Sequence, residues 1–182
     1  LAEAEVEYHD VTSHQVWVPF RVYKGKGSDK EWTQLTTYVV IWTTTPWTIP
    51  QNRAIAYGPG IAYASYEVIA VPEGSLAKVG DRYVVAQSLA EATFAAAKLD
   101  MSMVRKVADV EGEDLARWVC RHPLHGVDGA GGEWDYDVPL LPGEHVTEDA
   151  GTGFVHTAPS HGDDDYILGV RHGLKMTYNV EP

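Results

Sequence analysis

The chain of 182 residues has a single cysteine, Cys120, and no long hydrophobic run. A lone cysteine excludes an intrachain disulfide framework and fits a reducing compartment. No stretch approaches the roughly 20 apolar residues of a membrane-spanning helix. The acidic residues 1–5 also lack the basic, apolar pattern of a signal peptide. We therefore expect a cytoplasmic chain with no membrane partner.

Basic residues are also scarce, with 14 Lys and Arg against 26 Asp and Glu and a formal net charge of −12. Non-specific binding to nucleic acid depends on basic side chains that neutralise phosphates. If RNA is the substrate, its affinity must come from elsewhere in a larger protein, and this chain handles only the end of the RNA. The absence of an initiator Met favours such an excised piece, although processing of the N-terminus would also explain it. The length predicts one globular domain over residues 1–182.

Most of the chain consists of short runs of Val, Ile, Tyr and Thr between Gly, Pro and Asp turns, which is typical of strands. Two helices are expected: one over 88–98, opened by a capping box at Ser88 and Glu91, and one over 163–172, with Ser160 as a candidate cap and Gly173 as its end. These elements predict a mainly β, α+β fold, a compact and closed or nearly closed β-barrel with helical decoration. The glycine-rich segment 126–133 is expected to be a surface loop. The expected strands are 16–23, 36–44, 61–70, 83–86, 103–110, 117–120 and 153–158.

The first motif follows the β-branched run 39–41 and ends before Asn52. Consecutive strand residues face opposite sides, so three adjacent threonines fill a core poorly and line the mouth of a pocket better. Alone, three threonines also fit an ordinary strand that ends at a proline turn. The motif reads Trp42-Thr43-Thr44-Thr45-Pro46-Trp47-Thr48.

The second motif places His156 on an expected strand and three acidic residues in the first turn of the expected helix. Asp163 and Asp164 are explained by the favourable interaction of acids with a helix N-terminus. Asp165 lies one turn into the helix, where it can point back toward His156. The motif reads Gly151-Thr152-Gly153-Phe154-Val155-His156-Thr157-Ala158-Pro159-Ser160-His161-Gly162-Asp163-Asp164-Asp165-Tyr166.

Together the two motifs resemble the signatures of one family, the editing (CP1) domains of isoleucyl-tRNA synthetases, which are class I aminoacyl-tRNA synthetases. Every fixed position of the family pattern Gly-Thr-Gly-x-Val-His-Thr-Ala-Pro-x-His-Gly-x-x-Asp-Tyr is present. The related valyl and leucyl editing domains have Arg where this sequence has Thr45, so the resemblance favours the isoleucyl branch. The His-Ile-Gly-His and Lys-Met-Ser-Lys-Ser signatures of the synthetic site are absent.

The resemblance implies hydrolytic proofreading of Val-tRNA(Ile), with isoleucine excluded by its size. The implied catalytic set is Thr44, Thr45, Thr48 and Asp165: the carboxylate binds the α-ammonium group of the substrate, and the threonines face the ester, the ribose and the attacking water. The implied partner is the tRNA(Ile) 3′ end carrying valine, delivered by the rest of the synthetase. Valyl-adenylate is left open as a second substrate. We expect a monomer and no cofactor.

The implied substrate-binding set is Thr43, Trp47, Asn52, His156 and Asp165. The near-neutral pKa of a free histidine makes His156 a candidate general base, but the resemblance implies that it is the wall that excludes isoleucine, and we favour that role. Proton transfer is then left to water and the vicinal hydroxyl of the tRNA. Asn52 either orients the threonine loop or satisfies turn backbone. Trp47 forms either the pocket rim or packing under the loop.

Other chemistries have weaker support. Cys120, His122 and His125 offer three metal ligands where a structural zinc site uses four, so no metal is predicted. The acidic run 163–165 lacks the spaced oxygen ligands of a calcium loop. Ser160 is not part of a Gly-x-Ser-x-Gly elbow, which disfavours a serine hydrolase. The remaining alternatives are a module that binds the tRNA end or misactivated valine without catalysis, and a valyl- or leucyl-type editing domain.

Overall fold

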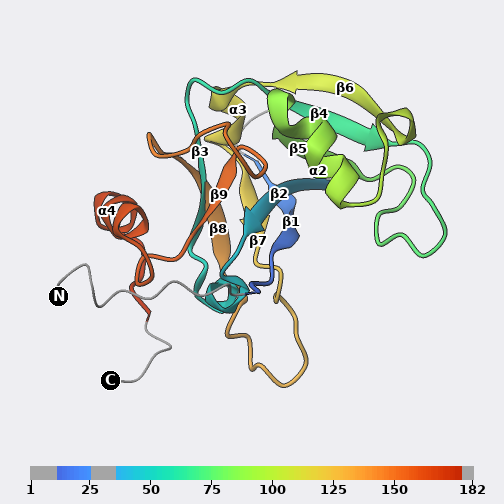
Figure 1. Cartoon of the computed structure of the whole chain (residues 1–182). Coiled ribbons are helices and arrows are strands. Elements are labelled where there is room, and N and C mark those ends of the chain that lie inside the picture. Colours follow the sequence, from blue (N-terminus) through green and yellow to red (C-terminus); the bar gives the residue numbers. More distant parts are fainter. Residues whose placement is uncertain (1–11, 26–35, 178–182) are drawn as a thin grey trace, which may run out of the picture.

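The computed structural model describes residues 12–25 and 36–177, which leaves the acidic residues 1–5 outside the described part. Nine strands form one mixed sheet in the order β6-β4-β5-β2-β1-β7-β8-β3-β9 (Figure 1). The strands are β1 (Val16–Lys24), β2 (Thr37–Thr43), β3 (Ala54–Tyr57), β4 (Tyr63–Val68), β5 (Arg82–Ala86), β6 (Val104–Val110), β7 (Val119–Arg121), β8 (Asp137–Pro142) and β9 (Phe154–Thr157). The α-helices are α2 (Ala90–Ala96), α3 (Gly112–Leu115) and α4 (Asp163–His172), and the 3-10 helices are η2 (Pro46–Gln51), η3 (Gln87–Leu89) and η4 (Met101–Met103).

The mainly β architecture with added helices confirms the predicted fold class. In the described residues no ladder joins the edge strands β6 and β9, so the sheet is open rather than closed. It is nevertheless close to closing, because β9 lies against β2. Thr152 joins the two sides: its hydroxyl donates to the Val40 carbonyl at 2.6 Å, and its own carbonyl accepts from the Ala86 N–H at 2.8 Å.

Strand β2 is buried on both faces, and this determines where its threonine end points. Val39 and Ile41 belong to the main core with Phe20, whereas Val40 faces a second core under α2 that includes Phe94. Side chains two residues apart share a face. Thr43 therefore continues the Val39–Ile41 side of the strand and emerges where the main core ends.

Helix α4 covers the β3–β9 side of the sheet (Figure 1) and has the bounds that the sequence predicts. Leu168 is buried against Ala56 and Val146. Gly169 permits close packing, since a Cβ there would lie 2.8 Å from Pro159. The chain leaves the helix at Gly173 with φ 64°, a left-handed conformation suited to glycine. None of the described helices is long and apolar enough to cross a membrane.

The two predicted side-chain caps are wrong. The N-cap of α4 is Gly162, which has no side-chain bond, and the Ser160 hydroxyl accepts instead from the Thr177 N–H at 3.2 Å. Ser88 lies in η3 and donates to Glu148, so α2 starts later, at Ala90. In each case the serine has a tertiary partner that competes with the local capping bond.

Strands β3 and β8 were missed by the sequence analysis. β3 is only four residues long, and β8 contains prolines at both 139 and 142, which normally argue against an interior strand. The two pair in parallel, with Ile55 opposite Leu140. This pairing joins segments far apart in the chain, which local patterns do not reveal.

Residues 122–136 form a long connection between β7 and β8. Segment 126–133 consists mainly of turns and is mostly exposed, with positive φ at all four of its glycines. At its base, His125 Nδ1 lies 2.8 Å from Asp135, and the same carboxylate oxygen accepts from the Gly126 N–H at 3.0 Å. The ends of the loop are therefore held together.

Candidate functional site

A pocket of about 190 Å³ lies where the end of β2, η2, β9 and the first turn of α4 meet. It brings together five residues that the sequence analysis singled out, and the outermost two, Thr43 and Asp165, are 122 positions apart in the chain. Most of its lining is polar, with one carboxylate, three hydroxyls and two imidazoles. The lining residues are Trp42, Thr43, Thr45, Thr48, Val155, His156, His161 and Asp165.

The threonine turn is held by its own side chains. Thr43 Oγ1 accepts from the Thr45 N–H at 3.1 Å and lies 3.2 Å from Thr45 Oγ1. Pro46 then begins η2, where a missing N–H costs nothing at a helix start. Within η2, Thr48 Oγ1 donates to the Thr45 carbonyl at 2.8 Å. The strand therefore ends in a tight turn that places two adjoining hydroxyls on the pocket wall.

His156 is buried, with 8% of its surface exposed, and both of its ring nitrogens are engaged. Asn52 Nδ2 lies 2.7 Å from Nδ1 and also 2.8 Å from the Ala54 carbonyl, which can only accept. The amide nitrogen must therefore face both groups, and Nδ1 is the accepting, unprotonated nitrogen. The proton is then on Nε2, which donates to Thr48 Oγ1 at 2.9 Å.

Burial lowers the pKa of His156 to about 4, with further lowering from His122 and His161. The ring is therefore neutral near pH 7 and is held from both ends by neutral partners. A general base needs a free lone pair aimed at the reacting proton, and the only lone pair of His156 is occupied by Asn52. The geometry fits a rigid wall better than a base.

Asp165 supplies the carboxylate of the pocket. Its Oδ2 accepts from the Ala158 N–H at 2.9 Å, which ties the first turn of α4 to the end of β9. Burial raises the pKa of Asp165, while the Ala158 N–H opposes that rise. A carboxylate that is partly desolvated in this way is a strong partner for a cationic group that enters the pocket.

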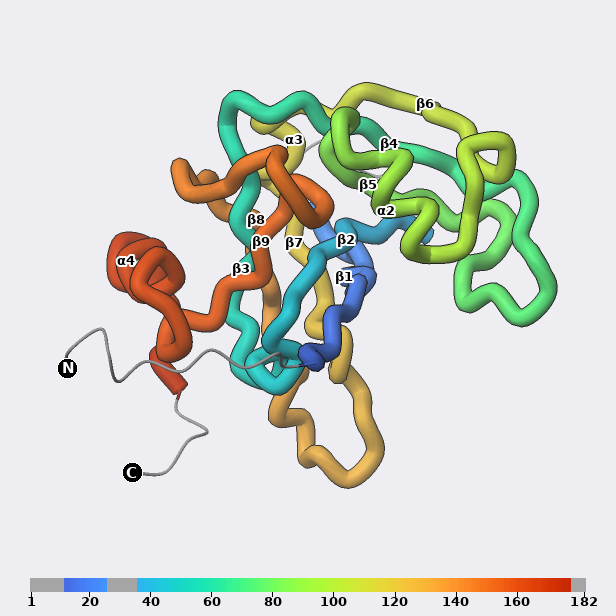
Figure 2. The backbone as a smooth tube through the Cα atoms, viewed as in Figure 1, coloured from blue at the N-terminus to red at the C-terminus, as the bar shows by residue number. Residues whose placement is uncertain are grey.

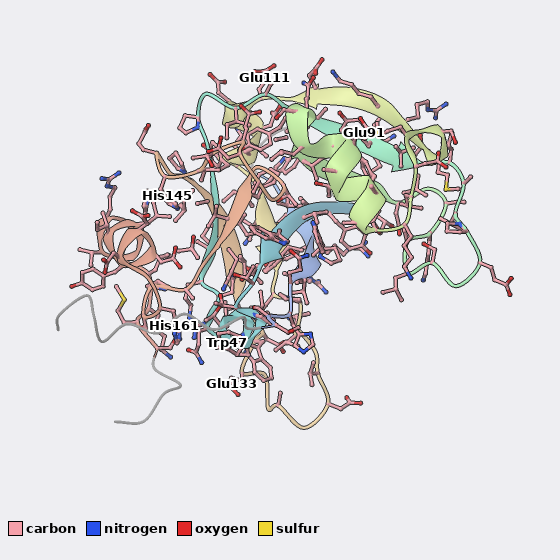
Figure 3. The ribbon with its side chains drawn as sticks, viewed as in Figure 1. Trp47, Glu91, Glu111, Glu133, His145 and His161 are labelled. Atoms are coloured by element: carbon pink, nitrogen blue, oxygen red, sulfur yellow. The ribbon has the colours of Figure 1, made fainter. Side chains whose placement is uncertain are left out.

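The remaining predicted residues lie outside this pocket. Thr44 lines a neighbouring pocket of about 310 Å³, which shares Trp42, Thr43 and Val155 with the first. Asn52 is fully buried behind His156. Trp47 is 62% exposed and lines neither pocket, at the same end of the molecule as His161 (Figure 3).

Three lining residues were missed by the sequence analysis: Trp42, Val155 and His161. Each stands inside one of the two motifs, and Trp42 and Val155 are neighbours of predicted residues. The signal for His161 was its place in the turn before α4, close to Asp165, but it was interpreted only as part of that turn. Its Nε2 atom is buried and has no hydrogen-bond partner among the described residues.

The described residues contain no cluster of three or more His, Cys, Asp or Glu side chains placed to hold a metal. Cys120 is buried in the main core, and burial raises the pKa of its thiol. His122 uses both nitrogens, donating to the Ile49 carbonyl at 2.9 Å and accepting from the Leu124 N–H at 3.1 Å. The hydroxyl of Ser160 accepts from the Thr177 N–H and has no hydrogen bond to a basic side chain among the described residues.

Comparison with solved structures places the fold. The editing domain of the P. knowlesi cytosolic leucyl-tRNA synthetase matches 88% of this chain and 63% of its own, with a TM-score of 0.59 and 14% identity. The corresponding P. falciparum domain matches 85% of this chain and 64% of its own, with a TM-score of 0.58 and 12% identity. The architecture is therefore that of a synthetase editing domain.

Comparison with curated sequences is more specific. Isoleucine–tRNA ligase of Ruegeria pomeroyi is 47% identical over 99% of this chain and 18% of its own length, and that of Rhodopseudomonas palustris is 51% identical over 97% and 16%. No family model matches. The chain is thus homologous, over almost its whole length, to one segment of isoleucine–tRNA ligases, and it spans less than a fifth of these relatives.

Proposed function

We propose that this chain hydrolyses the ester that joins valine to the 3′ end of tRNA(Ile), as the proofreading module of an isoleucine–tRNA ligase. The observation that carries the proposal is the pairing, in one small pocket, of the Asp165 carboxylate with the immobilised His156 ring. The carboxylate is suited to bind a cationic group, and the ring is suited to limit the size of the side chain that enters the pocket. A substrate with an α-ammonium group beside a short aliphatic side chain fits both.

Discrimination is the reason for such a pocket. One methylene in a hydrophobic site changes binding by roughly 1–3 kcal/mol, and the Ile/Val problem of this synthetase is a standard example of why a second, hydrolytic sieve is needed. His156 cannot swing away easily, because Asn52 and Thr48 hold both of its nitrogens. Valine then fits against the ring, and the extra methylene of isoleucine collides with it.

In this proposal the threonines bind the ester and do not act as nucleophiles that attack it. The Thr48 hydroxyl proton is committed to the Thr45 carbonyl, and among the described residues no basic side chain is hydrogen-bonded to the hydroxyl of Thr43 or Thr45. We therefore assign attack to a water molecule held near these hydroxyls. The water oxygen bonds to the ester carbonyl carbon, the bond to the ribose oxygen breaks, and that oxygen leaves with a proton originating from the water.

The neighbouring pocket fits the rest of the substrate. It opens from the same wall through Thr43 and Val155 and is larger, at about 310 Å³. An ester of the terminal nucleoside has to extend from the amino-acid pocket into such a space. We infer that the rest of the ligase binds the body of the tRNA, since the net charge of −12 gives this chain little affinity for phosphates.

The proposal carries further expectations. The ligase acts as a cytoplasmic monomer with residues 1–182 as its single editing domain, and valyl-adenylate is a second substrate if its acyl-phosphate anhydride also reaches the pocket. The rival is a module that binds the charged tRNA end without hydrolysis. It has the same pocket but needs no positioned water.

A deacylation assay separates the two. Val-tRNA(Ile) and Ile-tRNA(Ile), each labelled in the amino acid, are incubated with this chain and with a full-length ligase that carries it. We expect release of valine well above the spontaneous rate and little release of isoleucine. Binding of Val-tRNA(Ile) without release of valine would contradict hydrolysis and support the rival.

A further inference from the structure

The turn that carries Thr48 and Asn52 is held from below by the loop of residues 122–136 (Figure 2). Three aromatic side chains of this loop donate hydrogen bonds to backbone carbonyls of that turn. His122 Nε2 reaches the Ile49 carbonyl at 2.9 Å, Trp134 Nε1 the Pro50 carbonyl at 3.0 Å, and the Tyr136 hydroxyl the Asn52 carbonyl at 2.6 Å. We call His122, Trp134 and Tyr136 the aromatic platform.

Each platform residue is in the protonation state that the contact needs. Burial lowers the pKa of His122 to about 4, and its Nδ1 accepts from Leu124, so the neutral ring carries its proton on Nε2. Burial raises the pKa of Tyr136, which keeps its hydroxyl protonated. Indole N–H groups only donate. All three side chains are therefore donors, and all three carbonyls are acceptors.

The platform is also packed as a unit. The His122 ring stacks on Trp134 with centroids 6.2 Å apart and an interplanar angle of 17°, and it lies 5.5 Å from the Tyr136 ring. The Arg53 guanidinium lies over the Tyr136 ring, 4.2 Å from its centroid. Such packing limits the freedom of the rings and fixes the directions of their donors.

The two partners of His156 both belong to the held turn. Thr48, which bonds Nε2, comes directly before Ile49 and Pro50. Asn52, which bonds Nδ1, has its backbone carbonyl bound by Tyr136. A shift of the turn would therefore move both supports of the imidazole together.

We propose that Trp134 and Tyr136 are positioning residues for amino-acid selection, acting through Asn52 and Thr48 on the His156 ring. The inference rests on the proposed function for its kinetic consequence, but the placement of the ring can be measured without it. Neither residue lines the proposed amino-acid pocket or the neighbouring pocket. Their effect is therefore on how well isoleucine is rejected rather than on the hydrolytic step.

The test uses substitutions that each remove one donor and leave an aromatic ring: Trp134→Phe, in which a phenyl ring replaces the indole, Tyr136→Phe, which loses only the hydroxyl, and the double variant. The matched control is Tyr83→Phe on β5, which removes a tyrosine hydroxyl that bonds Asp81. The main readout is the kcat/KM for Val-tRNA(Ile) divided by that for Ile-tRNA(Ile), in this chain and in the full ligase. We expect this ratio to fall about fivefold for each single variant, the factor typical of one neutral hydrogen bond, and further for the double variant. Tyr83→Phe should leave it unchanged.

A second readout follows the ring directly. In the wild type, ¹⁵N NMR of His156 should show the neutral tautomer protonated on Nε2, and the double variant should show exchange between ring states. An unchanged selectivity ratio in all three variants would overturn the proposal, whatever their melting temperatures. If the wild type has no deacylase activity, the proposed function fails, and the His156 resonances alone then decide whether the platform positions the ring.

Discussion

Asn52 Nδ2 lies 2.7 Å from His156 Nδ1, so a buried amide holds the ring of a residue 104 positions away. The same amide nitrogen donates to the Ala54 carbonyl at 2.8 Å, which fixes its orientation and that of the ring. Asn52 therefore bonds nearby backbone and orients His156, whereas the alternatives drawn from the sequence were the threonine loop and turn backbone. This contact is what holds the His156 ring in one orientation at the pocket.

Replacing His156 by Ala should admit isoleucine. The truncation removes the wall and leaves space beside the valine position, so we expect hydrolysis of Ile-tRNA(Ile) to rise by about tenfold or more, within the range that one methylene can supply. The measurement is the kcat/KM for both aminoacyl-tRNAs. His172→Ala, an exposed histidine on α4, is the matched control. Continued rejection of isoleucine by His156→Ala would eliminate the sieve role.

Replacing Asp165 by Asn should remove valine recognition. Asn keeps an oxygen that can accept from the Ala158 N–H but lacks the charge that binds an ammonium group. We expect kcat/KM for Val-tRNA(Ile) to fall about 10- to 100-fold, the range for a hydrogen bond to a charged group. The same substitution at the exposed neighbour Asp164 should have little effect. Equal losses at both positions would point to the acidic helix start rather than to the carboxylate in the pocket.

Replacing Thr48 by Val should weaken both the fold and the selectivity. The substitution is nearly isosteric but leaves the His156 Nε2–H without its partner, whereas the Thr45 carbonyl keeps the bond from the Thr48 backbone N–H at 3.0 Å. A buried group without a partner costs about 1–3 kcal/mol of unfolding free energy, measurable by urea denaturation. Thr48→Ser retains the hydroxyl and should recover most of the loss. A serine variant as unstable as the valine variant would show that the methyl group matters instead.

Acid should destabilise the chain through its two buried neutral histidines. The pKa values of His122 and His156 are about 4 in the folded state, against an ordinary value of 6.5. Below pH 6.5 the unfolded chain binds protons that the folded chain does not, so stability falls as pH drops from 6.5 to about 4. Asp165 opposes this trend, since burial raises its pKa. Urea denaturation at several pH values should show that the free energy of unfolding falls less steeply with decreasing pH in His122→Gln than in the wild type. Equal slopes in the two proteins would refute this cause.

Gly153, just before β9, packs so closely against Ala86 of β5 that a side chain at this position should destabilise the fold. A Cβ there would lie 2.4 Å from the Ala86 Cβ, and φ is +82°. We expect Gly153→Ala to cost about 2–5 kcal/mol from overpacking and backbone strain together. Gly74→Ala, with φ +76° and open space around it, isolates the backbone contribution and should cost about 1–2 kcal/mol. Thermal and urea unfolding of both variants measure the difference.

The parts that could be predicted from the sequence are those with local causes. Helix α4 has acids at its start and Gly173 at its end, and its bounds match the prediction. The two site motifs are each short, so their residues could be assigned to one site by resemblance. Strand β8 could not be found this way, because its prolines argue against a strand and only its tertiary pairing with β3 reveals it.

The supports of the site were beyond sequence reasoning for a similar reason. Trp134 and Tyr136 flank a glycine-rich loop that looks like ordinary surface, and nothing local links them to residues about 84 positions earlier. The protonation state of His156 also follows from contacts made by Asn52 and Thr48 in three dimensions. Burial then moves its pKa away from the value that had made it a candidate base.

The most direct test of the account is a crystal structure of this chain with a non-hydrolysable valyl-adenosine analogue. We expect the α-ammonium group on the Asp165 carboxylate, the valine side chain against His156, and the nucleoside in the neighbouring pocket near Thr44. An analogue bound elsewhere, or bound with its ammonium group away from Asp165, would contradict it.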